Sequence, residues 1–316
     1  MIYDPTKYLR PKRLYICCEA EPMNPRLLSW LILIALMFTW GSSFILIKKG
    51  LLFFSVMEVG ALRVVITFLS LAPLALLRLF RTSARDLFYL GISGLAGSLI
   101  PAFLFAMAQT GIDSATAGML NSLTPLSTLI IGYMIFGLKA GPVNVAGVFV
   151  ALAGTIGLLH FSGGREFSFN IQYASYIIAA TILYAYNVNL IKAKLKHIPA
   201  VSITAITFFI AGIPATVILF GFTDFTTQLF SEPEALQGLG YIAILAVMGT
   251  GLAMIAFNKL IKMSSPLFAS SVTYMIPIVA LLWGIADNEH FHPSLILWMG
   301  LIIGGVVLVN LKVRKA

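Results

Sequence analysis

The sequence has few charged residues and almost no cysteine, and each shortage excludes a class of protein. Asp, Glu, Lys and Arg make up 10% of the 316 residues, whereas soluble domains carry about a quarter. Hydrophobic residues make up 59%, which is more than a soluble core can bury. The same figures exclude a disordered chain, because such chains are polar and poor in aromatics. The two cysteines, Cys17 and Cys18, are sequence neighbours and cannot form a disulfide framework.

Sequence motifs of common catalytic sites are also missing. The chain contains no HExxH, no paired CxxC and no GxxxxGK[ST] motif, which argues against metalloprotease, metal-cluster and ATP-driven chemistry. His290 and His292 lie beside Glu289, but two histidines without a third committed ligand are more often solvated loop residues. Ser98 has no histidine at matching depth to act as its base. We therefore expect no enzyme activity, no cofactor and no metal site.

Long stretches without charge are what the chain has in abundance. A helix needs about 20 mostly apolar residues to cross the hydrocarbon core of a bilayer, so the charged residues mark where spans end. They leave ten candidate spans, the second interrupted only by Arg63: 27–47, 59–77, 87–112, 114–138, 140–164, 167–191, 198–223, 235–258, 263–286 and 290–311. We therefore predict an all-α polytopic membrane protein with ten transmembrane helices.

The net charge of +9 is explained by membrane topology rather than by a nucleic-acid partner. If the N-terminus is cytoplasmic and the chain crosses ten times, most basic residues fall on the inner side, as the positive-inside rule requires. Both termini are then cytoplasmic. Residues 1–23 are polar and rich in charge. We expect a dispensable extension there, or an upstream start codon with Met23 as the true start.

The sequence contains an internal repeat. Residues 97–132 align with residues 249–284 at a constant offset of 152, and Lys48 aligns with Lys192 at an offset of 144. Each half then holds five helices, and because five is odd, the second half must be inverted relative to the first. Inverted repeats are a hallmark of secondary transporters, in which substrate binds near the midplane between the halves. The alternative is a duplication that merely built a stable bundle.

Four motifs resemble the EamA family of the drug/metabolite transporter superfamily: WGSSF at 40–44, ALR at 61–63, ATAGML followed by Pro125, and IPIVALLWGIADNE at 276–289. The resemblance covers about residues 24–312 and divides them into repeats at 24–162 and 167–312. It implies inverted five-helix repeats around a central cavity. It also implies a carrier of small metabolites such as amino acids in a bacterial inner membrane.

The chain departs from the family pattern at one position. The family often places a glutamate after the fourth helix, where this chain has Lys139 and no acid. Only the second repeat keeps an acidic end, at Asp287 and Glu289. A role for that acidic position therefore carries over to the second half alone.

Charged residues near or inside the spans are the first functional candidates, because a charge inside the hydrocarbon region is costly. Arg63 either binds a substrate carboxylate bidentately or snorkels to the headgroups and neighbouring carbonyls. Glu58 lies five positions away, off the same helical face, so a pair within the helix is not expected. Gate or vestibule charges are one interpretation of Lys48, Lys192, Asp287 and Glu289, while simple snorkelling is commoner for terminal lysines.

Polar and aromatic residues form the second group of candidates. Asn121 and Thr273 occupy equivalent positions before Pro125 and Pro277, and we expect these prolines to interrupt their helices and free carbonyls around a cavity. The same types of group can instead join helices or anchor the protein at the membrane interface. The other candidates for substrate binding are Trp40, Ser43, Tyr186, Asn187, Asn258, Tyr274 and Trp283, with Ser42, Tyr184 and Asn189 as further members.

These observations predict a secondary transporter, an exporter or exchanger, that works by alternating access. Substrate would bind between helices one, three and four and their counterparts six, eight and nine. The alternative is a non-transporting membrane scaffold or a lipid-carrier component. The expected partners are a small-molecule substrate and the lipid bilayer. Small-residue faces at Gly147-x-x-x-Ala151 and Gly300-x-x-x-Gly304 are read as scaffold contacts or as the contacts of a homodimer.

Overall fold

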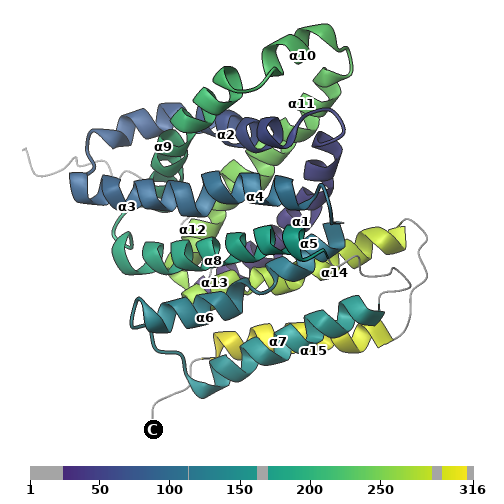
Figure 1. The fold of residues 1–316 in the computed structure, drawn as a ribbon. Coiled ribbons are helices and arrows are strands. Elements are labelled where there is room, and N and C mark those ends of the chain that lie inside the picture. The colour runs from purple at the N-terminus through teal and green to yellow at the C-terminus, as the bar shows by residue number, and fades with distance from the viewer. Residues whose placement is uncertain (1–23, 113, 162–169, 287–293, 312–316) are drawn as a thin grey trace, which may run out of the picture.

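The computed structural model describes residues 24–112, 114–161, 170–286 and 294–311, and in these residues it contains helices and no strand. Figure 1 shows the helices packed side by side, with α7 and α15 together at one edge of the molecule. The fold is therefore all-α, as the composition predicts. Asp287 and Glu289 lie outside the described residues.

The α-helices vary in length because several spans are built from shorter pieces. Their bounds are α1 (Pro25–Gly50), α2 (Val56–Leu79), α3 (Ala84–Gly94), α4 (Ile100–Ala108), α5 (Ser114–Asn121), α6 (Thr124–Met134), α7 (Pro142–Phe161), α8 (Ile171–Lys194), α9 (Ala200–Gly221), α10 (Phe225–Ser231), α11 (Ala235–Ile244), α12 (Ala253–Met263), α13 (Pro266–Ser270), α14 (Val272–Ala286) and α15 (Ser294–Asn310). The short helix α10 lies in the connection between the spans predicted at 198–223 and 235–258.

Six continuous helices in the described part of the chain are long and apolar enough to cross a membrane: Pro25–Gly50, Val56–Leu79, Ala84–Ala108, Ile171–Lys194, Ala200–Gly221 and Ala235–Met263. Shorter apolar helices cover 142–157, 266–279 and 296–310. The charge-free windows thus locate the helices. Two windows hold a broken helix, because 114–138 is divided into α5 and α6 and 263–286 into α13 and α14.

The two breaks do not both lie where the prolines predict. α5 ends at Asn121, and Pro125 lies in the first turn of α6, where its missing N–H leaves no helical bond unmade. Pro277 lies inside α14, and the break before that helix is at Ser271. The prediction that Pro277 interrupts its helix is therefore wrong, because a membrane helix tolerates an internal proline. The ring still leaves the carbonyl of Thr273 without its usual helical donor.

Two π-helical segments interrupt long helices at equivalent positions. The first, Leu95–Leu99, joins α3 to α4, and the second, Leu245–Leu252, joins α11 to α12. At the repeat offset of 152, the first segment falls on 247–251, inside the second. A π turn rotates the side chains that follow it around the helix axis, and such turns occur frequently at functional sites.

The C-terminal ends of α1 and α8 lie at opposite ends of the long rod formed by α11 and α12. A Cβ atom at Gly50, the last residue of α1, would lie 2.3 Å from Cδ1 of Ile242 in α11. At the end of α8, Nζ of Lys192 donates a hydrogen bond to the carbonyl of Ile261 in α12 at 2.9 Å. Ile242 and Ile261 are separated by about 28 Å of helix at 1.5 Å per residue. Lys48 and Lys192 are therefore separated by about the thickness of a hydrocarbon core.

α7 and α15 pack along each other through small residues (Figure 1). A Cβ at Gly147 would lie 2.7 Å from the carbonyl oxygen of Gly305, and a Cβ at Gly305 would lie 2.5 Å from the backbone nitrogen of Ala151. Gly300 and Gly304 face open space instead. Of the two faces expected to form scaffold contacts or to join copies of the chain, that of α7 is covered by α15 within the same chain, and a homodimer stays a prediction.

Candidate functional site

A cavity lies in the middle of the bundle, between the two π-helical segments and the two helix breaks. About 90 Å³ of it is open to the centres of water molecules, which is room for several waters or one small solute. Its wall is mostly apolar, but ten side chains bring polar atoms to it: Ser43, Arg63, Ser98, Asn121, Thr124, Tyr184, Asn187, Thr250, Ser270 and Thr273.

The cavity wall repeats at the offsets found in the sequence. In α1 and α8, an offset of 144 pairs Trp40 with Tyr184, Ser43 with Asn187, and Phe44 with Val188. In the other spans, an offset of 152 pairs Ser98 with Thr250, Ala102 with Met254, Phe105 with Phe257, Asn121 with Thr273, and Thr124 with Ile276. Arg63 has no such counterpart. The offset of 144 leads from Arg63 to Thr207, and an offset of 141, which pairs Phe68 with Phe209 and Pro73 with Pro214 in the same spans, leads to Thr204. The cation therefore belongs to one half only.

Arg63 extends from α2 to the π-helical segment of the other half. Its Nε donates to Oγ1 of Thr250 at 2.8 Å, and Thr250 donates in turn to the carbonyl of Leu245 at 3.1 Å. Glu58 is committed to the start of α2, where it accepts a hydrogen bond from the backbone of Ser55 at 2.8 Å. Within the part of the chain that the structure describes, no carboxylate forms an ion pair with Arg63. The bond through Nε leaves the two Nη groups for a ligand in the cavity.

Thr67, one turn further along α2, supports the backbone beneath Arg63. Its Oγ1 lies 2.8 Å from the carbonyl oxygen of Arg63 and 2.9 Å from that of Ala246 in the second π-helical segment. The hydroxyl hydrogen is therefore shared between the two helices. Together with the Arg63–Thr250 bond, this contact joins α2 to the π-helical segment at two successive turns.

Glycines allow the π-helical segments to approach the first helix of the opposite repeat. A Cβ at Gly97 would lie 2.0 Å from Nδ2 of Asn187, and a Cβ at Gly249 would lie 2.7 Å from Oγ of Ser43. Gly97 and Gly249 are equivalent in the repeat, and so are Ser43 and Asn187. The two halves thus make the same contact with each other in exchanged roles.

Aromatic rings form the apolar part of the wall. The ring of Phe105 lies 5.8 Å from that of Phe44 and 5.9 Å from that of Tyr184, on which it stacks. The ring of Trp40 lies 4.9 Å from that of Phe257, and its Nε1 donates to a carbonyl of the second π-helical segment at 2.9 Å. These contacts give the cavity rigid walls close to the guanidinium.

Five of the described candidates from the sequence do not line the cavity: Ser42, Tyr186, Asn189, Asn258 and Tyr274. Tyr274 is fully buried and donates from its hydroxyl to a carbonyl of α7 at 3.0 Å. Asn258 donates from Nδ2 to Oγ1 of Thr204 in α9 at 2.9 Å. The ring of Tyr186 lies 5.5 Å from that of Phe136. Tyr274 and Asn258 thus join neighbouring helices in this structure, and a role of these residues in substrate binding stays a prediction.

The end charges lie away from the cavity or outside the described residues. Lys192 is half-buried and donates to backbone carbonyls of the α12 end, whereas Lys48 is exposed. The side chain of Trp283, the acids Asp287 and Glu289, and the histidines of the same loop are outside the described residues. Among the described residues, no group of three or more His, Cys, Asp or Glu could hold a metal ion.

Four residues that line the cavity, Ser98, Thr124, Thr250 and Ser270, were not predicted from the sequence as substrate ligands, and Tyr184 was only a further candidate. The repeat offset was the available signal, because it pairs Tyr184 with Trp40 and Thr250 with Ser98. It was a weak signal for the hydroxyl residues, since serine and threonine in helices commonly bond to their own backbone. The binding region expected between helices one, three, four, six, eight and nine left out two helices of the wall: α2, which lines it through Arg63 and Val64, and α9, which lines it through Phe208.

Comparisons with known proteins match the chain to one family, in two segments. The model of the EamA-like transporter family matches residues 27–160 and again residues 172–311. The chain is 27% identical over 282 residues to the "Uncharacterized inner membrane transporter YedA" of Escherichia coli strain K12, covering 88% of this chain and 89% of that protein. YedA of strain O157:H7 gives the same figures. One crystal structure aligns at a TM-score of 0.69 and 20% identity, over 89% of this chain and 96% of its own, a likeness of fold alone.

Proposed function

Because the chain belongs to the EamA-like transporter family, we propose that it carries small metabolites such as amino acids across a bacterial inner membrane by alternating access. The observation that carries the proposal is Arg63, a cation in the wall of a central cavity with no described carboxylate paired to it. A charge at this depth is costly unless a partner offsets it. A substrate carboxylate supplies that partner, bound bidentately by the guanidinium.

The shape of the cavity agrees with a small solute. Its volume admits several waters or a solute of similar size, and its aromatic walls suit an apolar body beside a charged group. Asn121 and Thr273, on opposite repeats, offer further hydrogen bonds. The free carbonyl that Pro277 leaves at Thr273 adds an acceptor for an amine.

We further propose ten spans in two inverted five-helix repeats, with both termini cytoplasmic. The repeat-related cavity wall supports this arrangement, and so do the ends of α1 and α8, which are about 28 Å apart along α11 and α12. Rocking of one half against the other would expose the cavity to each side in turn. The protein would act as an exporter or exchanger and not as an enzyme.

Replacement of Arg63 tests the proposal. In proteoliposomes, we expect Arg63→Ala and Arg63→Gln to reduce uptake of a radiolabelled amino acid by about 100-fold, since hydrogen bonds to charged groups are the strong ones. Arg63→Lys should retain part of the activity. The exposed Arg81→Ala is the matched control, because it removes the same charge from the surface, and it should transport normally. Normal transport by both Arg63→Lys and Arg63→Gln would refute the proposal that Arg63 binds a substrate carboxylate.

The competing interpretation, a non-transporting scaffold or lipid-carrier component, makes a different prediction about water. Cysteines placed at 43, 121 and 273, after removal of Cys17 and Cys18, should react with a membrane-impermeant thiol reagent. Uniform protection from both sides of the membrane would favour the scaffold. Amines that lack a carboxylate should not compete with the labelled amino acid, which separates recognition by Arg63 from general permeability.

A further inference from the structure

Lys192 ties two helices together at one end of the bundle. Its Nζ donates to the carbonyl of Ile261 at 2.9 Å and to that of Lys262 at 3.2 Å, and it also donates to the carbonyl of Ser264. These carbonyls end α12, where the helix dipole favours a cation. The end of α8 is therefore fixed to the end of α12 by three charge-assisted hydrogen bonds.

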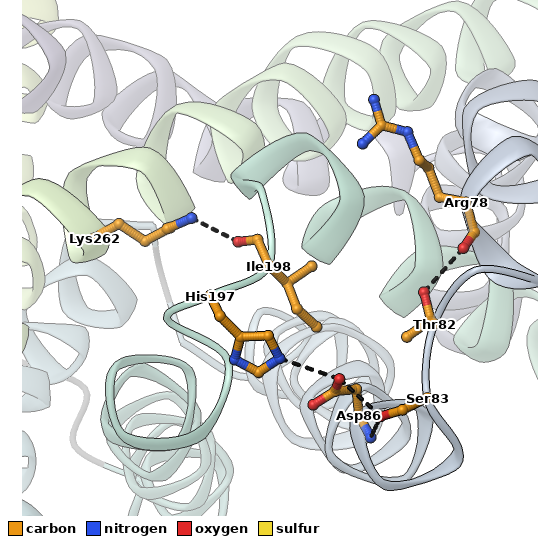
Figure 2. A network of polar contacts seen from close by, with 7 residues as sticks. All are labelled: Arg78, Thr82, Ser83, Asp86, His197, Ile198 and Lys262. Atoms are coloured by element: carbon orange, nitrogen blue, oxygen red, sulfur yellow. Dashed lines mark hydrogen bonds and ion pairs between the residues drawn. The ribbon is translucent and has the colours of Figure 1, made fainter.

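The connection between α8 and α9 makes further polar contacts at the same end of the bundle (Figure 2). Lys262 donates from Nζ to the carbonyl of Ile198 at 2.6 Å. In the same connection, Nε2 of His197 lies 3.1 Å from Oδ2 of Asp86, near the start of α3. Ser83 donates to the same carboxylate oxygen at 2.8 Å. The connection is thus held between the start of α3 and the end of α12, which shuts the bundle at the Lys192 end.

Lys48 makes no bonds of this kind to the described residues, although Lys48 and Lys192 occupy equivalent positions in the repeat. Lys48 is exposed and makes no hydrogen bond to any residue that the structure describes. At an offset of 152, the carbonyls bound by Lys192 correspond to those of Gln109, Thr110 and Ile112, which follow the end of α4. The side-chain amide nitrogen of Gln109, Nε2, is buried there without a hydrogen-bond partner among the described residues.

The cavity itself has the same asymmetry. Ile47, one turn before the end of α1, lines the cavity. Its counterpart Ile191 does not line the cavity, although both side chains are buried. The cavity therefore extends further toward the Lys48 end than toward the Lys192 end.

We propose that Lys192 and Lys48 are alternate latches of the transport cycle. The structure has the Lys192 latch closed and the Lys48 latch open. In the opposite state, Lys192 releases α12 and Lys48 donates to the carbonyls of Gln109, Thr110 and Ile112. This inference rests on the proposed alternating access. Each set of hydrogen bonds exists in one state only, so each lysine shifts the population toward the state in which it is bonded.

A cysteine in the cavity reports which end is open. The reporter is Ser98→Cys in a chain with Cys17→Ser and Cys18→Ser, labelled with a small membrane-impermeant thiol reagent in right-side-out and inverted vesicles. Without a latch substitution, we expect labelling mainly from the Lys48 side. Lys192→Met keeps the length of the side chain and removes the ammonium, and should raise the labelling rate from the Lys192 side about tenfold. Lys194→Met, at an exposed lysine of the same helix end, is the matched control and should change nothing.

A second substitution, at Lys48, distinguishes a latch from a helix end that is merely loosened by Lys192→Met. Adding Lys48→Met to Lys192→Met should return labelling from the Lys192 side toward its original rate, because both states then lose their bonds. A loosened end would stay open in the double variant, which would overturn the latch. No effect of Lys192→Met would overturn it as well. Fast labelling from both sides in every variant would instead contradict alternating access, a result distinct from failure of the latch.

Discussion

Gly97 and Gly249 set how closely the two halves approach each other at the cavity. Each is part of a π-helical segment, and each faces the first helix of the other repeat through a polar side chain, Asn187 or Ser43. Asn187 is held in place because its Oδ1 accepts a hydrogen bond from Ser93 at 2.6 Å. The side chain opposite Gly97 therefore has little freedom to move away.

Substitution of Gly97 should accordingly destabilise the fold. Gly97→Ala places a Cβ 2.0 Å from Nδ2 of Asn187, and we expect a loss of about 1–3 kcal/mol in the free energy of unfolding, as for other overpacked sites. The measurement is the apparent melting temperature of the purified protein in detergent. Gly91→Ala is the control in the preceding helix, since its Cβ would meet nothing within 4 Å. It should be neutral or stabilising by about 0.5–1 kcal/mol, and equal losses for both variants would refute the close-contact explanation.

Single residues also show what the sequence could and could not predict about the site. Arg63 could be singled out from the sequence, because a charged residue within an apolar span is unusual whichever helices pack against that span. Tyr184 and Tyr274 could not be distinguished, because both are tyrosines in apolar helices and only packing decides that one faces the cavity and the other α7. Trp40, Ser43, Asn121, Asn187 and Thr273 line the cavity, and whether they bind substrate stays a prediction.

At the scale of helices, glycine residues allow α7 and α15 to pack closely against each other. α7 and α15 approach so closely that a Cβ at Gly305 would meet backbone atoms of α7, whereas the adjacent Gly304 faces open space. Such close contact compensates for the absence of a hydrophobic driving force between helices in lipid. The pair packs Gly147, Ala151 and Gly305 against each other within one chain, whereas Gly300 and Gly304 lie outside this contact.

Two neighbouring glycines of α15 provide a matched test of this packing. Gly305→Ala should lower the free energy of unfolding by about 1–3 kcal/mol, because the backbone nitrogen of Ala151, at 2.5 Å from the new Cβ, has no rotamer through which to yield. Gly304→Ala should be tolerated. Thermal unfolding in detergent would measure both variants, and a destabilised Gly304→Ala with a neutral Gly305→Ala would reverse the assignment of the two faces.

The sequence predicts helices better than it predicts their interruptions. Charge-free windows locate the spans because a charged side chain is costly to place in the hydrocarbon region of the membrane. The second π-helical segment, in contrast, accepts hydrogen bonds from other helices, namely those of Trp40 and Thr67 to its carbonyls, and such long-range bonds cannot be read from the local sequence. Proline alone did not predict the interruptions, as the continuous helix through Pro277 shows.

At the scale of the whole molecule, the charges and the packing point to the same topology. The first connection follows α1 beside Ile242, and the connection after α8 lies beside the end of α12. The helix between these points is about 28 Å long. Lys192, Lys194 and Lys196 cluster at the second connection, so the positive-inside rule predicts a cytoplasmic position for it. In the proposed topology the first connection then lies outside, which is the relation that inverted repeats require.

Cysteine labelling of the two connections tests this topology directly. Leu52 is 77% exposed after α1, and Lys196 is exposed after α8, so a cysteine at either position should react without disturbing the core. In a chain without Cys17 and Cys18, Leu52→Cys should react with an impermeant reagent in intact cells. Lys196→Cys should react only in inverted vesicles or after permeabilisation. Labelling of both positions from the same side would mean that α1 and α8 run in parallel through the membrane, and inverted repeats with two alternate gates would then be impossible.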